Sequence, residues 1–171
     1  MSPATTPAVA PPTALGDASL VRILAAEPAL PPAAAAVLTT ALDKLFAQFA
    51  REGRCSAHAV NVEQDGRFLV MAWDGPALSG CSHDKLSQVV AQHETRSGAV
   101  MLAAPPIAIG APGAVALVDR PGLRALLAAA MVDGATPWWD VRAATLGAWR
   151  AGPLPLAASP FARLLPVGNQ P

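Results

Sequence analysis

The sequence predicts an α+β fold, a two-layer domain in which helices cover a partly antiparallel sheet. The first helix is indicated by apolar residues at helical spacing between residues 32 and 51. The dipeptide Asp65-Gly66, which is typical of tight hairpin turns, lies between two strand-like segments, and a second helical pattern begins after residue 80. Strands joined by a tight turn run antiparallel, so a doubly wound parallel sheet is not expected.

The chain length of 171 residues suits a single domain, which we place at residues 32–165. Residues 1–31 are rich in proline and alanine and are predicted to be a flexible extension, with disorder over the first 16 residues. Residues 166–171 are predicted to be a C-terminal tail.

Local patterns predict the elements of the first half. Residues 17–27 are expected to form a short helix, because their apolar side chains recur at helical spacing. Pro32 suits the first position of the long helix. Residues 58–63 alternate between apolar and polar side chains, whereas residues 67–74 are apolar on both faces. The second of these strands is therefore predicted to be central in the sheet and covered by helices.

The second half of the chain is less regular. Residues 99–103 and 114–118 are apolar, β-like runs, and Pro121 is expected to open a third helix. The proline-rich residues between the two runs predict no element. Residues 141–149 are compatible with either a helix or a strand.

The composition disfavours several classes of function. Twelve basic and twelve acidic residues give a net charge of zero, which argues against a nucleic-acid-binding protein or a binder of anionic membranes. Two cysteines in a chain of this length do not make a disulfide framework, so a cytoplasmic location is predicted. We find neither the pattern of a secretory signal nor an apolar run that predicts a transmembrane helix.

Reactive side chains are concentrated in residues 79–85, between a predicted strand and a predicted helix. We expect Ser82 to cap that helix and Asp84 to fall in its first turn. Cys81 would then lie where free backbone N–H groups stabilise a thiolate, with His83 and Asp84 as its candidate catalytic partners. The structural alternative is a small buried cysteine at the start of a helix.

The same stretch is a candidate ligand-binding loop. Ser79, Gly80 and Ser82 are placed to present N–H and hydroxyl groups to a bound anion at the helix N-terminus. Gly80 follows a strand and precedes a helix, which predicts a positive φ or a close approach of another backbone segment.

The pattern S-G-C-S-x-D, which begins at Ser79, resembles the central motif of a family of small uncharacterised bacterial proteins. Some members of that family carry the label ABC transporter ATPase. The resemblance spans about residues 38–163, and it adds Thr136 and Asp140 to the candidate ligand-binding residues. The chain departs from the family at His83. Because no G-x-x-x-x-G-K-[ST] motif is present, the resemblance implies a domain and a site but no ATPase chemistry.

Four side chains in two pairs have the residue types of a zinc site. Cys55, His58, Cys81 and His83 supply as many ligands as tetrahedral zinc needs, but their spacing is not that of a zinc site. The structural interpretation, which we favour, is a surface histidine at position 58 and a buried cysteine at position 55. No metal or other cofactor is therefore predicted.

Trp138 and Trp139 are the second unusual feature. Adjacent residues of a strand face opposite sides, so one tryptophan beside Asp140 and Arg142 would suit a protein partner or a flat ligand if it were exposed. The structural alternative, which we favour, is that both tryptophans are buried against a small sheet.

The sequence favours a binding protein over an enzyme. We expect a cytoplasmic bacterial module that binds a small molecule or an anion through residues 79–84, because no activating base, second thiol or phosphate-binding loop is identifiable. A thiol-dependent enzyme with Cys81 as its nucleophile is the first alternative. A structural or protein-interaction role is the second.

Overall fold

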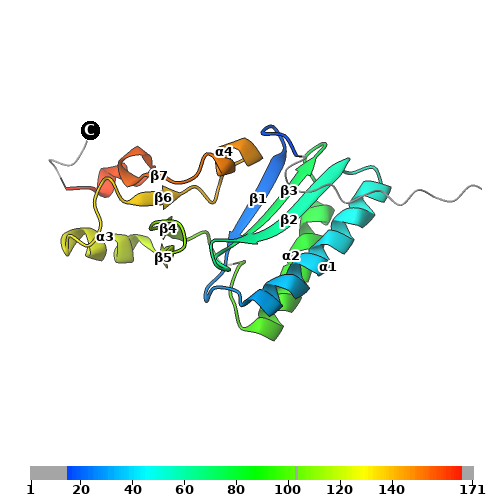
Figure 1. Cartoon of the computed structure of the whole chain (residues 1–171), viewed down its shortest axis with the longest axis horizontal. Helices are drawn as coiled ribbons and strands as arrows, with labels where there is room; N and C mark the ends of the chain where they lie inside the picture. The colour runs from blue at the N-terminus through cyan, green and yellow to red at the C-terminus, as the bar shows by residue number, and fades with distance from the viewer. Residues whose placement is uncertain (1–14, 103, 167–171) are drawn as a thin grey trace, which may run out of the picture.

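The structure, a computed structural model, describes residues 15–102 and 104–166 and confirms the α+β class (Figure 1). The predicted disorder of residues 1–14 and most of the predicted C-terminal tail lie outside the described residues. The helices and strands, in chain order, are β1 (Leu20–Ala25), α1 (Pro32–Arg51), β2 (Ala57–Glu63), β3 (Phe68–Asp74), α2 (Gly80–Ser97), β4 (Ile107–Ile109), β5 (Ala116–Val118), α3 (Arg120–Ala128), β6 (Pro137–Trp139), α4 (Leu146–Arg150), β7 (Leu154–Pro155) and the short 3-10 helices η2 (Leu156–Ala158) and η3 (Ala162–Leu164).

The strands form two antiparallel sheets, with the orders β1-β3-β2 and β5-β4-β6-β7. In the first sheet β3 is central, as predicted, because it pairs with β1 on one side and with β2 on the other. The predicted hairpin is confirmed: Asp65 and Gly66 lie in the turn between β2 and β3 with φ angles of 53° and 88°. The long helix α1 begins and ends where the sequence predicts.

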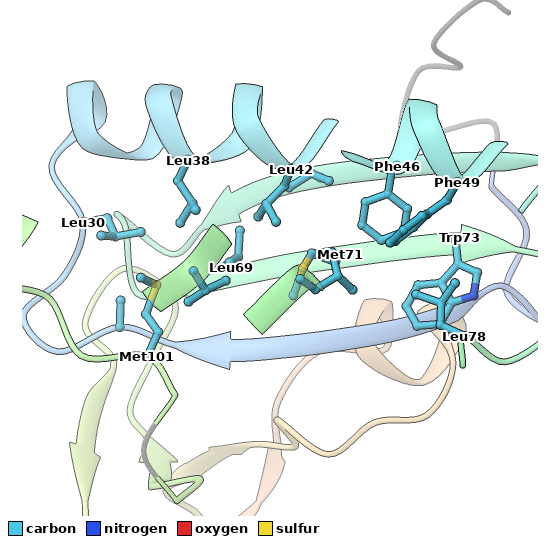
Figure 2. Packing of buried hydrophobic residues seen from close by; sticks show 14 of the residues in the cluster. Leu30, Leu38, Leu42, Phe46, Phe49, Leu69, Met71, Trp73, Leu78 and Met101 are labelled. Atoms are coloured by element: carbon cyan, nitrogen blue, oxygen red, sulfur yellow. The ribbon is translucent and has the colours of Figure 1, made fainter. Parts of the chain in front are cut away.

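Helices α1 and α2 cover one face of the first sheet. Leu42, Phe46 and Phe49 lie on one side of α1 and are completely buried. Phe46 packs against Trp73 of β3, with ring centroids 6.0 Å apart. Figure 2 shows the apolar side chains of α1 pointing toward β3. Each fully buried large apolar side chain stabilises the folded state by about 1.5–3 kcal/mol, so this layer is the main core of the first half.

The second half of the chain covers the other face of the first sheet. Phe68 of β3 packs against Trp139 and Trp149, with ring centroids 5.5 and 5.1 Å apart. Trp138 points to the opposite side of β6, where it packs with Phe161. The favoured prediction that both adjacent tryptophans are buried is confirmed. Helices α1 and α2 therefore cover only one face of β3, and the second sheet with α4 covers the other.

The predicted helix over residues 17–27 is wrong, because this segment contains β1. β1 pairs with β3 along its whole length, from Leu20 opposite Trp73 to Ala25 opposite Phe68. Its successive side chains contribute alternately to the core under α1 and α2 and to the core under the second sheet. An apolar residue is therefore useful at nearly every position. The folded domain begins before residue 32, the boundary that the sequence predicts.

The strands of the second sheet are shorter than the sequence patterns. In the described part of residues 99–103, Val100 forms only an isolated bridge with Glu27. β4, which lies where the sequence predicts no element, is an inner strand of the second sheet. Three residues are too few for a recognisable alternation. In the part of the chain that the structure describes, no helix is long and apolar enough to cross a membrane.

Candidate functional site

Residues 79–85 contain the start of α2. Ser79 is the N-cap of this helix, and its side-chain oxygen accepts a hydrogen bond from the N–H of Ser82 (3.3 Å). The prediction that Ser82 is the cap is wrong, because the helix already begins at Gly80. Asp84 is consequently the fifth residue of the helix, and no acidic side chain lies in its first turn. The expected stabilisation of Asp84 by the helix dipole is therefore lost, because this effect is confined to the first turn.

The hydroxyl groups of this segment are used inside the protein. Ser82 is completely buried, and its Oγ accepts a hydrogen bond from Nη1 of Arg54 (2.7 Å). The Oγ atoms of Ser79 and Ser82 lie 3.1 Å apart. Arg54 itself packs over the ring of Phe49, at the end of α1. Ser79 and Ser82 thus join the start of α2 to the end of α1, which gives both side chains a structural role.

Cys81 and His83 do not form a catalytic pair in this structure. Both lie in α2, and residues two positions apart do not face each other on a helix. Cys81 is exposed, whereas His83 is half-buried with its Nδ1 3.4 Å from Nη1 of Arg22. Because a guanidinium only donates hydrogen bonds, Nδ1 of His83 accepts. Burial and the charge of Arg22 lower the pKa of His83, and Asp84 opposes them more weakly, so the imidazole is neutral at pH 7.

The four residues weighed as zinc ligands do not converge. Cys55 and His58 are buried beneath α1, so the suggestion of a surface histidine at position 58 is wrong. His58 stacks on Phe46 at a centroid distance of 5.4 Å, and its Nε2 lies 3.8 Å from Oδ1 of Asp43. Burial lowers the pKa of His58 and raises that of Asp43, and in each group the charge of the other opposes the shift. The described residues contain no group of three or more His, Cys, Asp or Glu side chains that could hold a metal ion.

The two thiols are expected to react very differently with iodoacetamide. Cys81 should be alkylated in the native protein because it is exposed. Cys55 is 6% exposed and burial raises the pKa of its thiol, so it should react only after unfolding. Mass spectrometry of tryptic peptides after a timed reaction near pH 7 measures both sites in one sample.

The Cys81→Ser variant is the control for this labelling experiment. A rate at Cys81 well above that of a short cysteine peptide would favour a thiol-dependent reaction. An equal rate would make Cys81 an ordinary surface thiol. Comparable labelling of Cys55 in the native protein would contradict its buried position.

Thr136 and Asp140 flank β6 in the second sheet. Thr136 belongs to a tight turn, in which its Oγ1 accepts from the N–H of Asp133 (2.9 Å) and its own N–H donates to Oδ1 of Asp133 (3.0 Å). Among the described residues, neither Thr136 nor Asp140 is hydrogen-bonded to residues 79–84. Thr136 therefore has a structural role in the turn, whereas Asp140 lines a cavity.

This cavity, which we call the β1 groove, has a volume of about 1050 Å³ and lies between β1 and the second sheet. Ile23, Leu24 and Ala25 of β1 form one side of the groove. Trp138 and Phe161, whose rings meet edge to face at 6.2 Å, form part of the opposite side. The remaining large apolar lining residues come from the segment between the two halves, from β4 and β5, and from the residue after Asp140: Val100, Met101, Ile107, Leu117, Val118 and Val141.

Three arginines line the β1 groove: Arg120, Arg142 and Arg163. All three are exposed, and none of them forms an ion pair with a carboxylate of the described residues. They come from α3, from the segment after β6 and from η3. Their charges are therefore available to a ligand in the groove.

The carboxylates of the β1 groove, in contrast, already have partners. Glu27 forms an ion pair with Arg67 (2.6 Å). Asp119 caps α3 by accepting a hydrogen bond from the N–H of Gly122 (2.7 Å), and Asp140 accepts one from the N–H of Arg142 (3.0 Å). Of the three carboxylates, only Glu27 is paired with a cation, so the arginines of the groove outnumber its carboxylates without an ion pair by three to two.

A smaller cavity of about 490 Å³ lies on the face of the first sheet that packs against α4. Its lining includes Glu63 and Trp149, and Nε1 of Trp149 donates a hydrogen bond to Oε2 of Glu63 (3.0 Å). Because this carboxylate is already hydrogen-bonded, the smaller cavity offers less to a ligand than the β1 groove does.

Sequence reasoning found only part of the β1 groove. It singled out Trp138, Asp140 and Arg142, which are close in the sequence. It missed Arg120 and Arg163, because they lie about twenty residues to either side of Arg142 and resemble ordinary surface charge. No sequence signal distinguishes these arginines, since the fold alone brings them to one groove.

Comparisons with protein-family models, with curated proteins and with solved structures found no match to this chain. The resemblance of the S-G-C-S-x-D motif to bacterial proteins of one family therefore stays an expectation, and functional inference depends on the geometry of the chain itself.

Proposed function

We propose that the protein is a binding module, and that its β1 groove holds an elongated ligand with an apolar body and an anionic group. The observation that carries this proposal is the convergence of three arginines, none of them paired with a described carboxylate, on one apolar groove. The proposal keeps the class of function expected from the sequence. It moves the binding site from residues 79–84 to the groove, which contains Asp140.

The apolar part of the ligand is inferred from the lining. Small-molecule sites are typically concave and mostly apolar, with a few polar groups that determine orientation. In the β1 groove the aromatic rings of Trp138 and Phe161 and the side chain of Leu24 provide such surfaces. A flat or extended apolar group that covers them would be removed from water, at a gain of about 25 cal/mol for each Å² of apolar area buried.

The anionic part is inferred from the arginines. A guanidinium binds a carboxylate or phosphate through two parallel hydrogen bonds, and such charge-assisted bonds are stronger than neutral ones. Arg142 and Arg163 are exposed, so in the free protein their charges are solvated by water. An anion in the groove would replace part of this hydration. We expect it to contribute to specificity at least as much as to affinity.

A pair of fluorescent dyes tests the proposal. 1-Anilinonaphthalene-8-sulfonate carries an apolar aromatic body and an anionic sulfonate, whereas N-phenyl-1-naphthylamine has the same body without the charge. We expect the anionic dye to bind more tightly than the neutral dye. The double replacement of Arg142 and Arg163 by glutamine should lower the affinity for the anionic dye about tenfold or more. The affinity for the neutral dye should stay nearly unchanged.

The matched control is Arg124→Gln. Arg124 is also an exposed arginine, on α3, but it does not line the β1 groove. Its replacement should change the affinity of neither dye. Equal losses in the Arg124→Gln variant and in the double variant, or no preference for the anionic dye, would contradict the proposed function.

A thiol-dependent reaction is the second candidate. The observation that favours it is the exposed position of Cys81 in the first turn of α2, where a reagent can reach the thiol in the folded protein. His83 does not supply the activating base in this geometry, so the labelling rate of Cys81 described above decides whether this candidate survives.

A further inference from the structure

We propose that the ligand of the β1 groove is an extended peptide segment of a partner protein, which adds to the first sheet as a fourth strand beside β1. This inference rests on the proposed function, because it names the ligand class of the same site. It is carried by the backbone of β1, which is the outer strand of its sheet.

The outer edge of β1 is paired at both ends. At its start, the N–H of Val21 donates to the carbonyl of Ala144 (3.3 Å), next to the isolated bridge between Leu20 and Thr145. Just beyond its end, Glu27 and Val100 exchange two backbone hydrogen bonds of 3.1 and 2.8 Å. Between these points the edge faces the β1 groove.

Strand geometry shows which backbone groups face the groove. The backbone N–H groups of a strand point alternately to its two sides. The N–H groups of Val21 and Glu27 point outward, since they donate to Ala144 and Val100, whereas the N–H of Ala26 donates inward to Arg67 (2.8 Å). By this alternation the N–H and C=O groups of residues 23 and 25 point into the groove, and no described residue pairs with them.

These four backbone groups favour a peptide over other anionic ligands. A backbone polar group that is removed from water without a partner weakens binding, because its hydrogen bonds to water are lost and not replaced. A compact ligand that covers the edge of β1 with apolar surface would leave the groups of Ile23 and Ala25 unpaired. A peptide strand lying about 4.8 Å from β1 would pair with all four groups, because its own donors and acceptors repeat with the same period.

The length and charge of the peptide also follow from the groove. The two paired ends leave room for a strand of about four or five residues at about 3.3 Å per residue. Its alternate side chains would contact the apolar lining, which includes Trp138 and Phe161. Arg120, Arg142 and Arg163 would favour a glutamate, an aspartate or a terminal carboxylate in or next to this strand.

Amide hydrogen exchange tests the state of the free edge. In the full-length protein, the amides of Ile23 and Ala25 should exchange at least about tenfold faster than those of Arg22 and Leu24, which point toward β3. Peptides that bind the full-length protein are then selected from a random library displayed on phage. A selected, capped synthetic peptide should slow exchange at Ile23 and Ala25 by at least tenfold and displace the anionic dye from the groove.

N-methylation of the selected peptide tests the mode of binding. Methylating one backbone nitrogen at a time should weaken binding about tenfold or more at alternate residues and less than about twofold at the residues between them, since only every second N–H faces β1. Replacing the acidic residue of the peptide by its amide should weaken binding to the wild-type protein but not to the Arg142→Gln/Arg163→Gln variant. The Arg124→Gln variant should behave like the wild type.

Several results would overturn the peptide proposal while leaving the groove as a binding site. These are dye binding without any selected peptide, peptide binding that leaves exchange at Ile23 and Ala25 unchanged, and an N-methylation pattern without a period of two. Protection of the two amides only in a concentration-dependent dimer would identify a second copy as the occupant. Protection of these amides in the free protein that disappears when residues 1–14 are deleted would identify that segment as the occupant. If the anionic dye also fails to depend on the arginines, the proposed function fails as well.

Discussion

Replacement of Gly66 by alanine is expected to destabilise the protein severely. Gly66 lies in the turn between β2 and β3 with a φ of 88°, and a Cβ atom there would lie 2.1 Å from the carbonyl oxygen of Leu30. The backbone of Leu30 cannot shift without a large loss of stability, because Leu30 is buried and its N–H donates to the carbonyl of Gly66 (2.9 Å). Backbone strain and overpacking together should lower the free energy of unfolding by about 3 kcal/mol or more.

Gly80→Ala is the matched control for this experiment. The sequence predicted a positive φ or a close backbone approach at Gly80, and both predictions are wrong. Gly80 is the first residue of α2, its φ is not in the left-handed region, and a Cβ atom there would meet no atom within 4 Å. We expect Gly80→Ala to be neutral or slightly stabilising, because alanine loses less backbone entropy than glycine in a helix. Urea unfolding followed by circular dichroism measures both variants, and equal stabilities would contradict the geometry at Gly66.

Replacement of Phe46 by alanine is expected to cost about 3–5 kcal/mol of unfolding free energy. Phe46 is 0% exposed in α1, and its ring contacts those of Phe49, His58 and Trp73. Removing it leaves a cavity in the layer shown in Figure 2, between α1 and the first sheet. Such a loss is a large part of the 5–15 kcal/mol that is typical of a folded domain.

Val37→Ala on the same helix is the control for Phe46→Ala. Val37 is 57% exposed, so its truncation removes little buried surface, and alanine has the higher helix propensity. Its midpoint in urea should therefore stay close to that of the wild type or rise slightly. A similar loss in both variants would mean that α1 is not packed on the sheet through the side that carries Phe46.

The elements that the sequence predicts well are those held by local contacts. Helix α1 begins at a proline suited to its first turn and shows one apolar stripe, so its residues alone indicate its bounds. The hairpin of β2 and β3 depends on Asp65-Gly66 and on pairing between neighbouring segments. The start of α2 was predicted to within a few residues, but the sequence did not distinguish Ser79 from Ser82 as its cap, since both are suitable residue types.

The candidate site was only partly accessible from the sequence. Trp138, Asp140 and Arg142 attracted attention because they are unusual residues in one short segment. Arg120 and Arg163 did not, because an isolated arginine on the surface is ordinary in any chain. Their common position in the β1 groove depends on how α3, β6 and η3 are arranged around the second sheet, which no local pattern records.

The sequence by itself determined the α+β class, the long helix and the hairpin, and it favoured the burial of both adjacent tryptophans. Only the tertiary structure decided that residues 20–25 are a strand. Their apolar pattern fits a helix face as well as a strand that is covered on both sides. The choice was made by hydrogen bonds to β3, which lies far later in the chain, and by the second sheet, which buries the face that α1 and α2 leave open. Long-range contacts also determine the outer edge of β1. Ala144 and Val100 form backbone hydrogen bonds only near its two ends, and the β1 groove lies between these two points.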